Sequence, residues 1–222
     1  MTQETDATRY TVQEYFDLVT QGILQADDRV ELLEGIIVAE PPMDPPHASG
    51  ITRVDTAIRK LLGGRAVVRV QQPFIVGGYS VPEPDVAVVP GTEADYDTQH
   101  PTQALLIVEV AASSLPQDRL TKSRIYAAAQ VPEYWLVNLR DRCVEVFRDP
   151  DVANRVYRAR HVAQPGDDIA LAAAEASVRV SDLLPGLALL SPGVLQHPPR
   201  ILRSAALPER SQRERWSHLR ER

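Results

Sequence analysis

The chain has 222 residues, of which 44% are apolar and 24% charged, so it suits one globular domain with an appended segment and excludes wholesale disorder. The net charge of −6 combines an acidic body with a basic end, because residues 195–222 hold seven arginines and three glutamates. An acidic body argues against nonspecific nucleic-acid binding through a broad basic surface. The sequence has no membrane-spanning apolar run, no signal peptide, a single cysteine (Cys143) and no Cys/His zinc cluster, so we expect a cytoplasmic protein.

The N-terminal part predicts a helix followed by a hairpin. Thr11 and Glu14 form a capping-box pattern before an apolar repeat of helical spacing, which predicts a helix over residues 12–21. Two short apolar runs, 30–33 and 36–39, then flank a Glu-Gly pair, which is typical of a β-hairpin.

The middle of the chain changes from helix to strand patterns. Prolines predict a loop over 40–46, and the apolar spacing that follows predicts a helix over 47–62. Short runs rich in β-branched residues then predict strands at 66–70, 74–76, 86–89 and 105–111.

The run at 105–111 is apolar at consecutive positions, which indicates a strand buried on both faces at the centre of a sheet. A predicted helix over 117–130 separates it from a strand at 134–139, and this order favours parallel pairing. Residues 144–147 read as an antiparallel return, and residues 156–162 as one more strand. The sequence therefore predicts an α/β (α+β) domain over 1–190 and a Pro- and Arg-rich tail over 191–222.

Two acids stand beside the predicted central strands. Glu109 lies among aliphatic residues near the end of one strand, where an unpaired carboxylate is costly to bury, and Asp85 opens the strand before it. Two carboxylates brought together on neighbouring strands require a shared proton or a bound cation. Oxygen ligands without nearby Cys or His favour a hard divalent ion, Mg²⁺ or Mn²⁺.

The third candidate is Lys122, on the predicted helix that follows Glu109. Asp118, Lys122 and Tyr126 are four residues apart and share one helical face. Of 24 basic residues only Lys60 and Lys122 are lysines, so a lysine here is unusual. An ammonium group, whose pKa falls on desolvation, can help a metal-bound water to lose a proton, whereas a guanidinium group cannot.

The ordered set of motifs resembles the bacterial Uma2 family, a branch of the PD-(D/E)XK nuclease superfamily. The resemblance covers roughly residues 10–190. The motifs that carry it are Pro84-Asp85, Leu-Ile-Val-Glu109-Val, Asp118-x-x-x-Lys122-x-x-x-Tyr126, the segment 131–137, the segment 30–35, His47 and Gln72-Pro73. It implies a restriction-endonuclease-like mixed β-sheet flanked by helices, with a metal-dependent nuclease site.

The same resemblance implies roles for individual residues. Asp85 and Glu109 correspond to the metal ligands, joined by the main-chain carbonyl of Val110, and Lys122 to the signature lysine, here moved to the helix after the strand. Glu31 corresponds to an N-terminal acid that would position a second metal ion or its waters. Further side chains expected around the site are Glu34, His47, Gln72, Asp118 and Tyr126. The sequence departs from the family pattern at 111–116, where Ala-Ala-Ser-Ser-Leu-Pro replaces a Ser-Pro-Ser-like turn.

Each candidate also has a structural interpretation. Asp85 could cap a turn, Glu31 could be a polar residue of an edge hairpin, and Asp118 could stabilise a helix start. His47 could be a helix-cap contact, and Tyr126 could belong to the core.

The function expected from sequence is an Mg²⁺-dependent endonuclease that hydrolyses nucleic-acid phosphodiester bonds, with DNA as the preferred substrate. The alternatives are a catalytically inactive nucleic-acid-binding or protein-interaction module and a hydrolase of small phosphate esters. Cleavage of both strands of a duplex needs two sites, which is compatible with a homodimer, and no membrane partner is expected.

Overall fold

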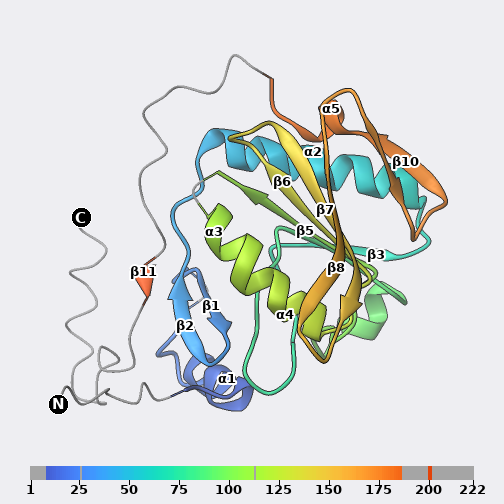
Figure 1. Cartoon of the computed structure of the whole chain (residues 1–222). Helices are drawn as coiled ribbons and strands as arrows, with labels where there is room; N and C mark the ends of the chain where they lie inside the picture. Colours follow the sequence, from blue (N-terminus) through green and yellow to red (C-terminus); the bar gives the residue numbers. More distant parts are fainter. Residues whose placement is uncertain (1–8, 26, 113, 187–199, 202–222) are drawn as a thin grey trace.

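The computed structural model describes residues 9–25, 27–112, 114–186 and 200–201, and its centre is a six-stranded mixed sheet (Figure 1). The strands lie in the order β3-β4-β5-β6-β7-β8, with β5 and β6 parallel and the other four neighbouring pairs antiparallel. Their bounds are β3 Val67–Val70, β4 Val86–Val89, β5 Leu106–Ala111, β6 Glu133–Asn138, β7 Cys143–Asp151 and β8 Val156–Ala163. The predicted fold class, a mixed sheet flanked by helices, is confirmed.

The crossover between β5 and β6 contains the candidate residues Asp118, Lys122 and Tyr126. It consists of α3 (Leu115–Gln117), a π-helical turn (Asp118–Lys122) and α4 (Ser123–Ala128). In the π turn the Ser123 N–H donates to the Asp118 carbonyl five residues earlier. The predicted parallel pairing across a helix is confirmed, but a single regular helix over 117–130 is wrong, because the helix widens at this turn and ends near residue 128. Such turns often occur at functional sites.

Helices cover both faces of the sheet, as Figure 1 shows. On one face, α2 (Pro45–Leu62) packs Ile51, Val54 and Ile58 against β4 and β5, and α5 (Val180–Leu183) lies beside it. On the other face, α4 packs Ile125 and Tyr126 against the central strands. The central strand β5 is buried at every position from Leu106 to Ala111, as its continuous apolar run predicted.

The helix α2 begins two residues before the predicted start. Asp44 is its N-cap, and its carboxylate accepts the His47 N–H at 2.9 Å. Pro45 and Pro46 follow in the first turn. Proline fits there because N–H groups of the first turn have no acceptor within the helix, so the absence of an N–H costs no hydrogen bond. Gly63 ends the helix in the left-handed conformation, at φ 55°. The proline-rich loop is therefore shorter than predicted.

The N-terminal segment forms the predicted helix and hairpin. α1 (Val12–Thr20) has the Thr11–Glu14 capping box in both directions. β1 (Val30–Leu33) and β2 (Ile36–Ala39) pair antiparallel around Glu34 and Gly35, both at positive φ, as a tight hairpin turn requires. β11 (Arg200–Ile201) adds a third strand beside β2. These two residues are the part of the predicted 191–222 tail that the structure describes.

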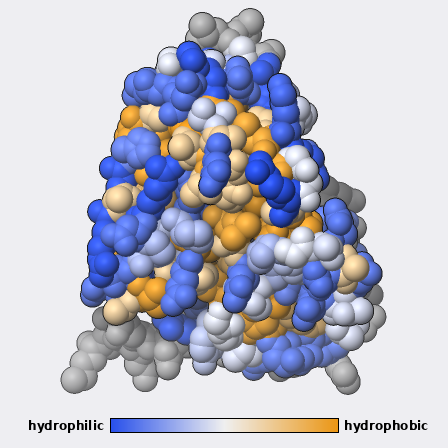
Figure 2. Space-filling view, turned by 90° about the vertical axis from the view of Figure 1, so that its right-hand side faces the viewer, coloured by the Kyte–Doolittle hydropathy of each residue, from blue (hydrophilic) through white to orange (hydrophobic). Residues whose placement is uncertain are grey.

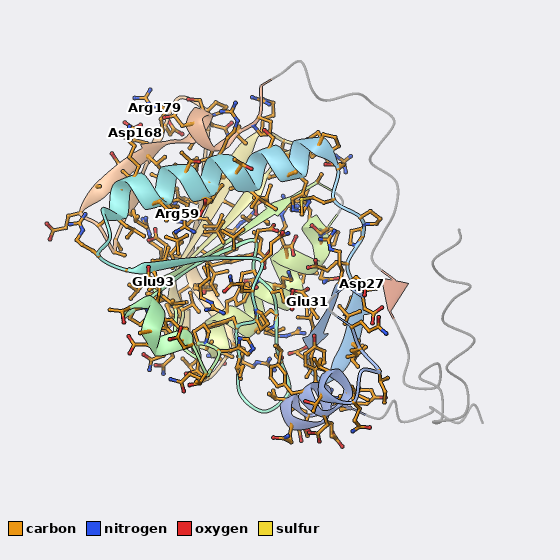
Figure 3. The ribbon with its side chains drawn as sticks, turned by 180° about the vertical axis from the view of Figure 1, so that it is seen from behind. Asp27, Glu31, Arg59, Glu93, Asp168 and Arg179 are labelled. Atoms are coloured by element: carbon orange, nitrogen blue, oxygen red, sulfur yellow. The ribbon has the colours of Figure 1, made fainter. Side chains whose placement is uncertain are left out.

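Two further features differ from the sequence prediction. The predicted strand at 74–76 is a loop, where Val76 forms an isolated bridge with Ser80 around a turn at Gly77. A short 3-10 helix, η1 (Glu93–Tyr96), was not predicted. A separate antiparallel pair, β9 (Asp168–Leu171) and β10 (Ala176–Arg179), lies over α2 with an exposed Arg179–Asp168 ion pair, far from Glu31 in the view from behind (Figure 3).

The edge strand β8 is exposed at most of its positions, including Val156 and Val162. It also carries Arg158 and Arg160, and charged side chains of this kind discourage pairing with another sheet edge. The surface shown in Figure 2 has an apolar band bordered by hydrophilic side chains. Within the described residues, no helix has both the length and the apolar character to cross a membrane.

Candidate active site

The two predicted acids lie side by side at the centre of the sheet. β4 and β5 are antiparallel with Val86 opposite Val108, so Asp85 lies opposite Glu109 on the same face. The Asp85 main-chain N–H lies 3.4 Å from Oε2 of Glu109. Both residues are buried, and the antiparallel register therefore accounts for the meeting of two residues that are 24 positions apart.

The Asp85 carboxylate is held on three sides. Its Oδ2 accepts the Val110 main-chain N–H at 2.8 Å and lies 3.1 Å from Nε2 of His47, at the start of α2. Its Oδ1 accepts the side-chain amide of Gln71 at 3.3 Å. In an extended strand the N–H and C=O of one residue point to the same edge, so the Val110 carbonyl also faces the Asp85 side.

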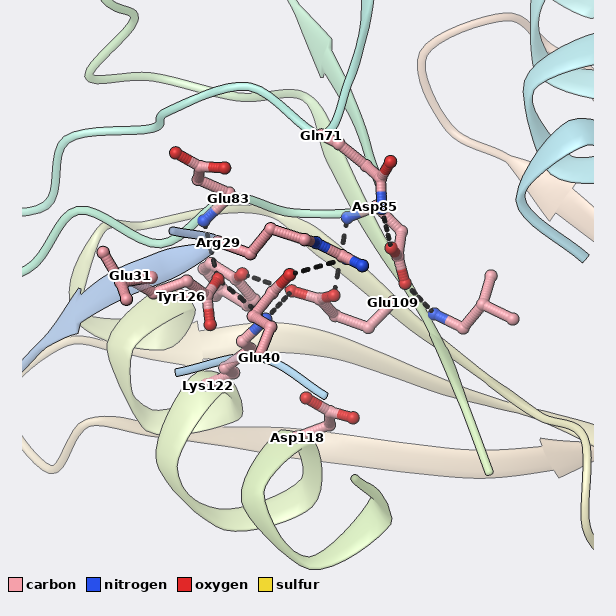
Figure 4. Close-up of polar contacts among 12 residues, drawn as sticks. Arg29, Glu31, Glu40, Gln71, Glu83, Asp85, Glu109, Asp118, Lys122 and Tyr126 are labelled. Atoms are coloured by element: carbon pink, nitrogen blue, oxygen red, sulfur yellow. Dashed lines mark hydrogen bonds and ion pairs between the residues drawn. The ribbon is translucent and has the colours of Figure 1, made fainter. Parts of the chain in front are cut away.

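Lys122 joins the acids to the N-terminal hairpin (Figure 4). Its Nζ lies 3.1 Å from Oε1 of Glu109 and 2.9 Å from Oε1 of Glu31. The Tyr126 hydroxyl donates to the same Glu109 oxygen at 2.6 Å. Lys122 is only 4% exposed, so this ammonium group is part of a buried ion-pair network.

Glu31 reaches this network from β1. The isolated bridge between Leu32 and Val81 attaches the hairpin to the segment before β4. Oε1 of Glu31 also accepts the Glu83 main-chain N–H at 2.7 Å. Glu31 is fully buried, which rules out the edge-hairpin interpretation of this residue.

Burial and mutual repulsion raise the pKa values of these acids. Burial raises the pKa of Glu31 to about 7, against the opposing charge of Lys122. Burial also places the pKa of Glu109 well above its usual range, and the nearby carboxylates of Asp85 and Asp118 add to the rise while Lys122 opposes it. Asp118 is buried on the π turn with its pKa raised to about 6 for the same reason. The cluster therefore holds more buried carboxylates than Lys122 can neutralise.

The pKa of Lys122 moves in the opposite direction from the sequence-based expectation. Burial alone lowers it, but the charges of Glu109 and Glu31 outweigh burial and raise the pKa well above the usual lysine value. The argument that desolvation would make this amine easier to deprotonate is therefore wrong for the arrangement seen here. Lys122 is an ammonium group at neutral pH.

The pKa of His47 reflects its contact with Asp85. Burial lowers this pKa, but the hydrogen bond to Asp85 and the Asp85 charge outweigh burial, and the pKa is raised overall. His47 thus adds positive character beside Asp85, in addition to its main-chain contact with the helix cap.

Two expected residues lie outside the cluster. Glu34, at the tip of the hairpin, pairs with Arg124 and Arg155 on the surface. Gln72 is exposed, and its neighbour Gln71 contacts Asp85. Gln71 has a φ of 49°, so the chain turns there and Gln71, instead of the expected Gln72, faces the site.

Sequence reasoning missed several polar neighbours of the cluster. Glu83 lies next to Glu31, and its pKa is raised to about 7 by burial and by the charge of Glu40. Glu40 in turn forms an ion pair with Arg29 at 3.2 Å, and Figure 4 shows this pair close to the buried residues. The sequence offers no pattern that identifies these residues, because each approaches from a loop or a strand end.

The donor set fits a hard divalent cation. Asp85 and Glu109 provide carboxylate oxygens, the Val110 carbonyl faces the same edge, and the raised pKa of Glu109 shows that the crowding of buried carboxyl groups favours either a proton or a cation between them. Across residues 9–25, 27–112 and 114–186, no three His, Cys, Asp or Glu side chains already converge as a metal cluster. A main-chain oxygen would therefore have to complete the protein ligands.

Comparison with known proteins supports the fold and assigns the family. A solved structure described as a "putative nuclease belonging to DUF820 from Anabaena variabilis ATCC 29413" superposes with a TM-score of 0.60, at 16% identity, over 78% of this chain and 97% of that chain. At this identity the similarity concerns the fold alone. No curated protein matches the sequence significantly. The Uma2 family, described as "Putative restriction endonuclease", matches residues 12–186, and the chain therefore belongs to the Uma2 family.

Proposed function

We propose that this protein is a metal-dependent endonuclease that hydrolyses phosphodiester bonds of nucleic acid, with DNA as the substrate. The observation that carries the proposal is the buried contact of Asp85, Glu109 and Lys122, which come from two strands and a helix. A structural role alone gives no reason to bury several carboxylates around one lysine, since an ion pair of this kind seldom adds net stability. The family description supports the same reaction class.

Asp85, Glu109 and the Val110 carbonyl would hold Mg²⁺, with Mn²⁺ as the alternative. A divalent ion in such a site polarises the phosphate and lowers the pKa of a water molecule. The chain's own contribution is to fix the two carboxylates before substrate arrives. The Val110 N–H and His47 orient Asp85, and Tyr126 orients Glu109.

Lys122 would act as a fixed positive charge. Its raised pKa keeps it protonated, so it can donate a hydrogen bond and offset the charge that develops on the phosphate oxygens in the transition state. Glu31 accepts from both Lys122 and the Glu83 N–H, which supports a role in orienting Lys122 in place of the second-metal role suggested by the sequence.

The test is nicking of supercoiled plasmid by purified protein with Mg²⁺, and with EDTA as the blank. We expect nicking by the wild type and loss of nicking in the isosteric double variant Asp85→Asn/Glu109→Gln. Asp168→Asn, which removes an exposed acid from β9, is the matched control and should nick normally. Undiminished nicking by the double variant would contradict the assignment of both acids.

Two additional readouts refine the result. Calorimetric titration with Mg²⁺ should give binding to the wild type and none to the double variant. Nicked circles that appear before linear DNA would indicate independent single-strand cuts, whereas linear DNA formed directly would indicate two sites acting together in a homodimer. Plasmid binding without nicking would favour the alternative, an inactive binding module on the same fold.

A further inference from the structure

A surface cavity of about 740 Å³ has Glu34, at the hairpin tip, in its lining, and none of the residues of the buried carboxylate cluster line it. Its walls come from the turn at Glu34, the loop 75–80, α4 and the turn between β7 and β8. In Figure 1 the teal loop containing residues 75–80 runs down beside α1 and α4. The volume lies within the range of small-molecule sites, which is about 300–1,000 Å³.

The cavity carries excess positive charge although the whole chain is acidic. Arg9, Arg124 and Arg155 line it together with a single acid, Glu34. Arg124 and Arg155 each lie 2.5 Å from a different oxygen of the Glu34 carboxylate, and Arg9 has no ion-pair partner among the described residues. Burial raises the pKa of Glu34, but its hydrogen bonds to the two arginines outweigh burial and lower the pKa overall.

The contacts of Glu34 show what these arginines can bind. A planar guanidinium group has five donors arranged for carboxylate or phosphate, and one carboxylate cannot satisfy two such groups. Arg124 and Arg155 therefore keep donors free for the oxygens of a second anion. Together with Arg9, they favour a ligand that carries at least one negative charge.

The remaining walls of the cavity suit a flat ring of a ligand. Tyr79 lines it and is 51% exposed, whereas the other aromatic side chains among the described residues are buried or half-buried. Ile125 of α4, with Ala128 and Ala129, supplies an apolar wall. A Cβ added at Gly77 or Gly78 would meet no atom within 4 Å, so the loop leaves the space beside Tyr79 open.

We propose that this cavity binds one unpaired nucleotide, with its phosphate on Arg124 and Arg155 and its base stacked on Tyr79. Arginine beside an exposed aromatic ring is the combination by which proteins hold single-stranded nucleic acid. The bound nucleotide could be part of a substrate strand or a free nucleotide. The first of these two ligands rests on the proposed nuclease function.

The cavity is built from the two segments that also carry the candidate active site. Arg124 follows Lys122 by two residues, and Glu34 follows Glu31 by three. The hairpin and α4 are thus joined by a buried pair, Lys122–Glu31, and by an exposed pair, Arg124–Glu34. A nucleotide bound beside Glu34 would therefore contact the same hairpin and the same helix that carry Glu31 and Lys122.

The experiment measures binding of a fluorescent single-stranded oligothymidylate by anisotropy, in EDTA so that no cleavage occurs, with adenosine monophosphate as competitor. Tyr79→Ala is expected to weaken binding by about tenfold, as loss of one stacked base would, whereas Tyr79→Phe keeps the ring and should bind normally. Arg124→Ala should weaken binding by a similar factor. Arg53→Ala, which removes an exposed arginine from α2, is the matched control and should have no effect.

A second variant tests the competition with Glu34. Glu34→Gln removes the internal carboxylate charge while keeping its size, so we expect tighter binding of the oligonucleotide. Equal binding by wild type, Tyr79→Ala and Arg124→Ala would overturn the proposal. An equal loss in Arg53→Ala would also overturn it, because the effect would then be general electrostatics.

The competitor distinguishes the two sources. Displacement of the oligonucleotide by adenosine monophosphate indicates a free-nucleotide site, whereas binding of the oligonucleotide alone indicates a contact with a substrate strand; both support the cavity. Asp85→Asn/Glu109→Gln should retain Tyr79-dependent binding. If the wild type nicks plasmid while Tyr79→Ala binds the oligonucleotide as tightly as the wild type does, this inference alone is overturned. Tyr79-dependent binding without nicking would overturn the proposed function alone.

Discussion

The ammonium group of Lys122 lies 2.9 Å from the carboxylate of Glu31, although 90 residues separate the two positions along the chain. Both side chains are almost completely buried. The contact fixes the hairpin against the helix that leaves the central strand, and the same ammonium group contacts Glu109 at 3.1 Å. One buried charge therefore connects the N-terminal segment to the sheet.

Lys122→Met is expected to lower the free energy of unfolding by about 3–5 kcal/mol at neutral pH, because it leaves Glu31 and Glu109 buried without a counter-charge. The double variant Lys122→Met/Glu31→Gln should be more stable than Lys122→Met, since it has one uncompensated carboxylate fewer. Urea denaturation of both proteins measures the difference. A double variant as unstable as the single one, or less stable, would show that the two residues are not coupled.

Tyr126→Phe removes the hydroxyl that donates to Glu109 at 2.6 Å. We expect a stability loss of about 1–2 kcal/mol and, if the proposed function holds, a fall in the nicking rate of about tenfold, because Glu109 loses its orienting partner. Tyr157→Phe is the control, since its hydroxyl donates to the Val131 carbonyl away from the acids. It should lose similar stability and retain its nicking rate.

Gly50→Ala should destabilise the protein by about 1–3 kcal/mol, although glycine-to-alanine changes usually stabilise a helix. A Cβ at this position would lie 2.8 Å from Cγ1 of Val110, the residue whose N–H holds Asp85. Val110→Ala should restore part of the loss in the double variant. Thermal melts of the three proteins provide the comparison, and stabilisation by Gly50→Ala would show that α2 can move away from β5 at little cost.

Glu145→Gln should destabilise the protein by about 2 kcal/mol at neutral pH and much less in acid. Burial raises the pKa of Glu145, but hydrogen bonds from Arg119 and Arg160 outweigh burial and lower it below the usual 4.5. A lowered carboxyl pKa contributes stability above the unfolded-state pKa, and this contribution is lost as the pH falls through the folded-state value. Denaturation of both proteins across the acid range would show the two stability curves converging; curves that stay parallel would contradict the ion-pair explanation.

Local sequence signals predicted much of the fold. The capping box at Thr11 and the glycine at position 63 set helix ends through contacts within a few residues, so the structure follows them closely. The apolar run of β5 identified the central strand because burial on both faces leaves no room for alternation. The meeting of Asp85 and Glu109 also followed from neighbouring strands.

The errors arise where distant contacts decide the outcome. The direction of the Lys122 pKa shift depends on Glu31, whose proximity no local pattern reveals. The exchange of Gln72 for Gln71 depends on one residue with positive φ at a strand end. The π turn that divides the predicted helix 117–130 carries Lys122, whose partner Glu31 is distant in the sequence.

The π turn determines which way three of the buried polar side chains point. In an α-helix, residues four apart are offset by about 40° around the axis, so Asp118, Lys122 and Tyr126 would fan out by about 80° in total. The wider turn takes more residues per revolution and reverses part of that offset, and all three side chains are buried while Leu120 between them is 69% exposed. The number of residues in this turn, as well as their identity, therefore sets the directions in which these side chains point. Insertion or deletion of one residue within 118–122 would therefore change the relative directions of Asp118, Lys122 and Tyr126 without substituting any of them.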